Sequence, residues 1–115
     1  MRGDNSETFE TPTFTIVATG DDSVACLSGR IDMDFSPILR EQLVSLMKSG
    51  SSKTLSIDLS GITHMDSSGI ATLIEGLKIA RSNGVDLRLQ GLQGRILRLF
   101  EVTGILSLFN GRIRG

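Results

Sequence analysis

The segment from Thr54 to Leu77 constrains the fold of this chain more than any other. An alternating apolar run, Thr54 to Leu59, is followed by a short turn and then by Asp66-Ser67-Ser68-Gly69. Asp and Ser are favoured at helix N-caps because their side-chain oxygens accept the backbone N–H groups of the first turn. The sequence therefore predicts a strand, a turn, and a helix that begins at about Ser67 or Ser68.

Asp66, Ser67 and Ser68 offer more capping groups than one helix needs. A helix cap with a spare serine is the plainest interpretation, and the spacing alone favours it. The spare hydroxyl would still lie at the positive end of the helix dipole, where a phosphate is electrostatically tolerated.

Periodicity along the rest of the chain predicts the order β-β-α-β-α-β-α. We expect strands at 14–19 and 24–28 joined by a turn at 20–23, a helix from Ser36-Pro37 to Gly50, a strand at 86–90, a helix from about Gln93 to Gly104, and a final apolar segment at 105–109. Crossovers of one hand place helices on one side of parallel strands, and alternating strands have only one covered face. The prediction is a small α/β domain with a four- or five-stranded mixed sheet and helices mainly on one face.

The same periodicity predicts which helix faces are buried. In the helix after Ser68 we expect Ile70, Leu73, Ile74 and Leu77 to face inward and Thr72 to face outward. In the helix after Gln93 we expect these residues to face inward: Ile96, Leu99, Phe100 and Thr103.

Composition restricts the partners and the compartment. The 115 residues carry a net charge of −1, which gives no electrostatic reason to expect nucleic acid. Cys26 is the only cysteine, so an intrachain disulfide is impossible, and its apolar neighbours predict a buried structural thiol. No apolar stretch has membrane-spanning length or the form of a signal peptide. We expect a cytoplasmic protein without membrane insertion.

Two motifs resemble the STAS domain family, whose stand-alone members are bacterial anti-sigma-factor antagonists. Asp66-Ser67-Ser68-Gly69, after a strand and turn reading S-I-D-L-S-G-I-T, is similar to the family signature. Gly29-Arg30-Ile31-Asp32 is similar to the family's Gly-x-x-Asp turn before its first helix, although Arg30 and the Ile70-Ala71-Thr72 continuation depart from the usual pattern. The resemblance covers about residues 12–109. It implies a STAS domain at 12–110, a flexible N-terminal tail at 1–11 and a C-terminal tail at 111–115.

The resemblance also implies a function and a site. It implies that Ser67 is phosphorylated, that Ser68 is the helix cap, and that an anti-sigma-factor serine kinase contacts Asp32, Asp66, Ser68 and Gly69. The kinase would supply ATP and Mg²⁺, a serine phosphatase would reverse the modification, and the chain itself would need no cofactor. Asp32, which we expect to be exposed, has an alternative role as a turn residue that caps local backbone.

Two other function classes remain to be weighed. His64, Asp66 and Ser67 are the ingredients of a hydrolytic triad, but three groups within four residues cannot align as nucleophile, base and orienting acid. His64 is more simply a turn residue at the edge of the core, and we expect no enzyme. The second class is a constitutive STAS scaffold subunit of a larger complex, such as a lipid-transport assembly, which needs the cap but no phosphorylatable serine.

Overall fold

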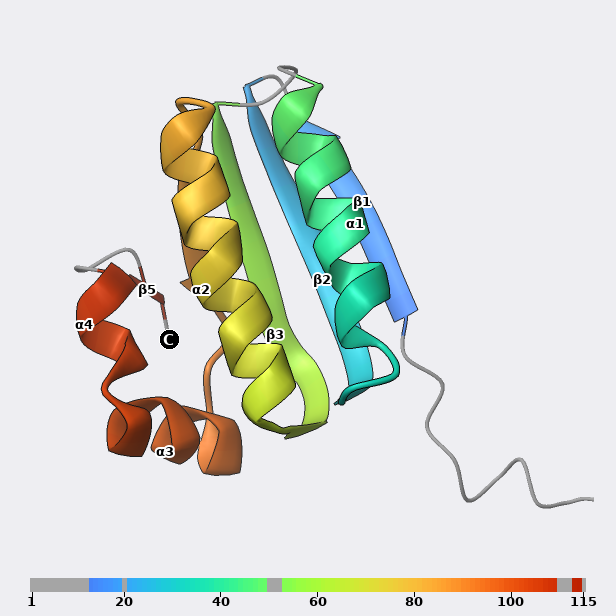
Figure 1. Cartoon of the computed structure of the whole chain (residues 1–115). Helices are drawn as coiled ribbons and strands as arrows, with labels where there is room; N and C mark the ends of the chain where they lie inside the picture. Colours follow the sequence, from blue (N-terminus) through green and yellow to red (C-terminus); the bar gives the residue numbers. More distant parts are fainter. Residues whose placement is uncertain (1–12, 20, 50–52, 110–112, 115) are drawn as a thin grey trace, which may run out of the picture.

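The computed structural model describes residues 13–19, 21–49, 53–109 and 113–114, which form one five-stranded sheet and four helices (Figure 1). The elements in chain order are β1 (Thr13–Thr19), β2 (Asp22–Ile31), α1 (Ser36–Lys48), β3 (Thr54–Met65), α2 (Ser67–Ser82), β4 (Asp86–Gln90), α3 (Gly94–Thr103), α4 (Ile105–Phe109) and β5 (Ile113–Arg114).

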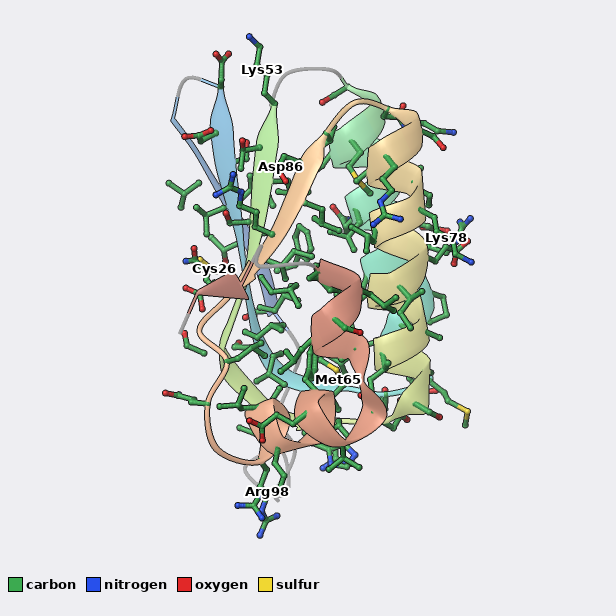
Figure 2. All side chains as sticks on the ribbon, turned by 90° about the vertical axis from the view of Figure 1, so that its left-hand side faces the viewer. Cys26, Lys53, Met65, Lys78, Asp86 and Arg98 are labelled. Atoms are coloured by element: carbon green, nitrogen blue, oxygen red, sulfur yellow. The ribbon has the colours of Figure 1, made fainter. Side chains whose placement is uncertain are left out.

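The sheet has the order β1-β2-β3-β4-β5. β1 pairs with β2 antiparallel, and every later neighbour is parallel. α1 and α2 lie side by side over one face of this sheet, while α3 and α4 lie beside the start of α2 and the β4–β5 side (Figures 1 and 2). The predicted α/β class, mixed sheet and one-sided helices are confirmed.

The core lies between the sheet and the helices. Every second residue is buried along β2, along β4 and along β3 as far as Leu59, as the alternating sequence predicts. Beyond Leu59 the alternation ends: Ile62 and Met65 are buried, and the residues between them are exposed. The buried apolar side chains from the helices are Leu39, Leu43, Met47, Leu73, Leu77, Ala80, Ile96, Phe100, Ile105 and Phe109. The outward face of the sheet stays open. Cys26 lies there, half-exposed and away from α1 and α2 (Figure 2), so the prediction of a buried thiol is wrong.

Two strands run further than their sequences predict. β2 continues to Ile31 and β3 to Met65, so Gly29 to Ile31 and the whole of residues 60–65 are strand rather than turn. The two extensions pair with each other through register shifts between Cys26 and Ser28 and between Gly29 and Arg30. Gly29 has φ 88°, a conformation that favours glycine and allows the strand to bend without ending.

Several smaller expectations also need correction. Asp22 and Ser23 belong to β2 rather than to the turn, and His64 is an exposed strand residue rather than a turn residue at the edge of the core. The final apolar segment, for which no type was predicted, is the helix α4. Thr72 is buried because its hydroxyl donates to Ser68 O within the helix (2.8 Å) and needs no water. Thr103 is exposed near the C-terminal end of α3, and Leu99 is only half-buried.

The chain ends fall partly outside the described residues. The predicted N-terminal tail, 1–11, lies outside them entirely, and so does most of the segment predicted as a C-terminal tail. Within that segment, however, Ile113 and Arg114 pair with Leu89 and Gln90 as β5. None of the helices in the described part of the chain is long and apolar enough to cross a membrane.

Candidate functional site

Asp66 joins the end of β3 to the start of α2 and caps that helix. Its backbone is extended (φ −105°, ψ −174°), which directs the carboxylate at the first turn. Oδ1 accepts hydrogen bonds from Ser68 N (2.9 Å) and Gly69 N (3.3 Å). The prediction that Ser68 is the cap is therefore wrong: Ser68 is already inside the helix, where its hydroxyl cannot reach the first-turn amides that a cap satisfies.

The Ser68 hydroxyl is fixed between two partners. It donates to Asp66 Oδ1 at 2.5 Å and lies 2.9 Å from the hydroxyl of Ser36, the first residue of α1. A serine hydroxyl has one proton, and that of Ser68 is used on the carboxylate, so Ser36 is the donor of the second bond. Ser36 is only 6% exposed. These bonds join the start of α1 to the start of α2.

Ser67, next to Ser68, is different. It is the first residue of α2 and is exposed. Among the described residues, no hydrogen bond or ion pair involves its side chain. Within the described part of the chain, the Ser67 hydroxyl is therefore exposed and has no bond to another residue.

Asp32 lies at the same end of the sheet as Asp66 and also accepts hydrogen bonds from backbone N–H groups. Its Oδ1 accepts from Asp34 N (3.0 Å) and Phe35 N (3.2 Å), and its carbonyl oxygen accepts from Ser36 N (2.9 Å). Asp32 is half-buried rather than exposed as expected. The turn-capping role is thus present in the structure, and contact with a kinase remains a prediction.

The two motif segments meet directly. Asp66 N donates to Ile31 O (3.1 Å), so the residue before Asp32 and the residue before Ser67 are joined by a backbone hydrogen bond. In Figure 1 both connections, β2 to α1 and β3 to α2, lie at the same end of the molecule. The structure brings Asp32 to the same end of the molecule as the consecutive residues Asp66, Ser67 and Ser68, from which it is far apart in sequence.

Comparison with known proteins identifies the family of this site. The family model described as "Mlab, STAS domain" matches residues 14–109. The chain belongs to the STAS domain family. The anti-sigma-B factor antagonist of Bacillus subtilis (strain 168) is 34% identical over 84 residues, which are 73% of this chain and 75% of that protein.

Solved structures confirm the STAS fold. An anti-sigma factor antagonist from Mycobacterium paratuberculosis superposes with a TM-score of 0.79 at 22% identity, covering 90% of this chain and 86% of that one. The Bacillus cell fate determinant SpoIIAA in its phosphorylated form superposes with a TM-score of 0.69 at 16% identity, covering 90% of this chain and 91% of that one.

The Asp66 carboxyl of this STAS site ionises more readily than an ordinary Asp, because its pKa is lowered. The hydrogen bond from the Ser68 hydroxyl lowers the pKa of Asp66, slight burial opposes this, and the backbone amides of Gly69 and Ser68 and the charge of His64 lower it further. Asp32 and Asp34 add carboxyl groups on the neighbouring turn. Among the described residues, no group of three or more His, Cys, Asp or Glu side chains could hold a metal ion.

Gly69 has a packing role in this site. It is buried, and a Cβ placed on it would lie 2.8 Å from Ile31 Cγ2 and 2.8 Å from Met65 Cγ. Figure 2 shows Met65 in the layer between the sheet and the helices. The glycine therefore lets α2 begin close against β2 and β3, and the predicted contact of Gly69 with a kinase would have to be made by its backbone.

Three residues in or just before the first turn of α1 have features that the sequence did not predict. Ser36, noted only as a helix start, holds Ser68, and nothing in its spacing indicates this. Met33 and Ile38 are large apolar side chains that remain 75% and 51% exposed in the turn before α1 and in its first turn. Met33 could have been found from the sequence, because it is an apolar residue between two aspartates, Asp32-Met33-Asp34, in a turn that needs no apolar side chain.

Proposed function

We propose that this STAS domain is an anti-sigma-factor antagonist whose binding to an anti-sigma serine kinase is controlled by phosphorylation of Ser67. One observation carries the proposal: of the two adjacent serines, Ser67 has an exposed and unbonded hydroxyl at the start of α2, while Ser68 is bonded on both sides. The names of curated relatives support the antagonist role, and a protein of the same fold has been solved in a phosphorylated form.

In the unphosphorylated state, the Ser67 end of α2 and the Asp32 turn dock on the kinase and displace its sigma factor. The kinase supplies ATP and Mg²⁺. The Ser67 oxygen forms a bond to the γ-phosphorus, the bond to the bridging oxygen of ADP breaks, and the hydroxyl proton passes to a base of the kinase. A serine phosphatase restores the hydroxyl. The chain contributes the acceptor and the docking surface, without a catalytic group or cofactor of its own, and acts in the cytoplasm.

The phosphate that results lies at a favourable place in the domain. The positive end of the α2 dipole stabilises an anion there, while the amides of Ser68 and Gly69 stay bonded to the Asp66 cap. For the partner, the same charge is unfavourable, because a dianion must lose its water when the surfaces meet. The modification can thus release the kinase while the antagonist stays folded.

The test is capture of the partner by the purified full chain, followed by incubation of the pair with ATP and phosphosite mapping by mass spectrometry. We expect one phosphate, on Ser67, and release of the captured kinase. Modification of Ser68 instead would contradict the site. Stable capture of a larger assembly, unaffected by ATP, would favour the constitutive scaffold role.

A further inference from the structure

Within the described part of the chain, β1 is an edge strand of the sheet. It is seven residues long, T-F-T-I-V-A-T, with no charged residue, proline or glycine, and it pairs with β2 from Thr13↔Ser28 to Thr19↔Asp22 without a register shift. Natural proteins usually protect an edge strand with a charge, a proline, a bulge or short length. The opposite edge, β5, is two residues long and contains Arg114, whereas no strand among the described residues covers the outer edge of β1 (Figure 1).

The register shows which backbone groups of β1 face outward. Thr19 and Asp22 pair across a two-residue connection, and in such a hairpin the closing pair exchanges both of its hydrogen bonds. Hydrogen-bonded pairs then alternate along the ladder. Thr15 and Val17 therefore bond to β2, while the N–H and C=O groups of Phe14, Ile16 and Ala18 point away from it.

The side chains of β1 suit pairing with an identical strand. Ile16 and Val17 are 36% and 52% exposed, so both have apolar surface still to bury. When two copies of β1 run antiparallel about Ile16, Ile16 lies opposite Ile16, Phe14 opposite Ala18, and Thr15 opposite Val17. No charged side chains oppose each other, and every outward N–H meets an outward C=O.

We propose that a second copy of this chain pairs with β1 in this way, about a two-fold axis at Ile16, so that one sheet continues through both protomers. The contact is isologous and closes on itself, since it uses the same edge of each copy. It consists mainly of one strand edge, smaller than the about 1,200–2,000 Å² of a stable interface, so the dimer is weak and depends on concentration. β1 is separated from β3 by β2, so the pairing leaves Ser67 accessible. The inference is independent of the proposed function.

Sedimentation velocity of the full chain over a wide concentration range tests the dimer. The wild type should shift from monomer to dimer as concentration rises. Ile16→Lys should remain monomeric at every concentration, because it places two ammonium groups together at the axis. Ile38→Lys is the matched control: it adds the same charge at an exposed isoleucine of α1 and should dimerise like the wild type.

Amide hydrogen exchange of the wild type tests the register without a mutation. Exchange at Phe14, Ile16 and Ala18 should slow several-fold at high concentration, whereas Thr15 and Val17, already bonded to β2, should be protected at all concentrations. A monomer at every concentration, a dimer with unchanged exchange at these amides, or open-ended assemblies would overturn the proposal. Protection of the outer amides at all concentrations would also overturn it, because residues 1–12 of the same chain would then cover the edge.

Discussion

Ser67 and Ser68 are adjacent, but their hydroxyl groups have different surroundings. A helix turns about 100° per residue, so adjacent side chains point in different directions. Here that rotation directs Ser68 at Asp66 and Ser36 and leaves Ser67 in solvent. The proposal that Ser67 is the phosphate acceptor rests on this difference, and it can be tested residue by residue.

Ser68→Ala should lower the free energy of unfolding by about 1–3 kcal/mol, because a charge-assisted hydrogen bond is lost and the buried Ser36 hydroxyl loses its acceptor. Ser67→Ala should change it by no more than about 0.5 kcal/mol, as an exposed side chain without partners. Urea unfolding of both variants measures this contrast. A larger loss for Ser67→Ala would mean that its hydroxyl has a structural role.

Phosphorylation should depend on Ser67 rather than on Ser68, the reverse of their effects on stability. Ser67→Ala should accept no phosphate from the cognate kinase, while Ser68→Ala should still be modified at Ser67. Mass spectrometry of the two variants after reaction with ATP decides the assignment, and a phosphate on Ser67→Ala at Ser68 would contradict it.

Asp32 combines two roles that two substitutions can separate. Asp32→Ala removes the acceptor of two backbone N–H groups and should cost about 1 kcal/mol of stability. Asp32→Asn keeps an oxygen in that place, so it should unfold nearly like the wild type but bind the kinase more weakly because the charge is gone. Thermal melts and kinase affinity are the two measurements. Unchanged affinity for Asp32→Asn would leave Asp32 a turn residue only.

Asp66 should make folding sensitive to acid. Because its pKa is lowered in the folded state, its stabilising contribution is present above the ordinary pKa of Asp and is lost as the pH falls through the lowered value. Urea unfolding from about pH 5 to about pH 2 should therefore show a steeper loss for the wild type than for Asp66→Asn. Burial raises the pKa of Asp58, but hydrogen bonds from Ser60 and Gln90 together lower it further, so that its pKa is also below the ordinary value; both proteins keep this group. Parallel curves would show that Asp66 has no such contribution.

At the scale of the elements, two buried glycines of α2 give a matched pair. Gly69→Ala would place a Cβ 2.8 Å from Ile31 and Met65, and overpacking of this kind costs about 1–3 kcal/mol. Gly76→Ala would place a Cβ at ordinary contact distance, 3.5 Å from Leu43 Cδ1 and 3.6 Å from Leu87 Cδ2. There the better helix propensity of Ala should stabilise the protein by up to about 1 kcal/mol. Thermal melts of both variants should move in opposite directions, and a shared direction would contradict the packing of α2.

The order of elements could be predicted from sequence, but the ends of β2 and β3 could not. Alternation in Leu55, Ile57 and Leu59 reports a one-sided strand directly. Ser60 and Gly61 are small residues typical of a turn, and only pairing with the end of β2, across register shifts that place the extra residues on β3, makes this segment a strand. That pairing is a tertiary contact, invisible in either segment alone.

Part of the candidate site could likewise be predicted from the sequence and part could not. Asp66, Ser67 and Ser68 could be found because a cap motif is local. The sequence could not show which of the three residues caps the helix, because that depends on the extended backbone of Asp66. Nor could it show which serine hydroxyl is bonded, because Ser36, the partner of Ser68, lies in another helix. Ser36 gave no local signal, since Ser36-Pro37 is typical of any helix start.

At the scale of the whole molecule, phosphorylation of Ser67 should leave the fold nearly unchanged and strongly weaken binding to the partner. A phosphoserine adds roughly −1.5 to −2 charges at neutral pH. The N-terminal end of α2 stabilises that charge, and the repulsion from Asp66 only partly opposes it. We therefore expect closely similar thermal melts in the two states, with α2 intact.

Binding should respond much more strongly. Docking must remove water from the dianion, and without a cation opposite it that desolvation costs several kcal/mol. Each 1.4 kcal/mol is a tenfold change in affinity, so a loss of about 100-fold or more is expected. Ser67→Asp should reproduce part of this loss, having one charge and fewer acceptor oxygens. Isothermal titration of the kinase with each form measures the difference. Equal affinities would remove the switch, and a collapsed melt on phosphorylation would replace repulsion at the interface with unfolding of the antagonist.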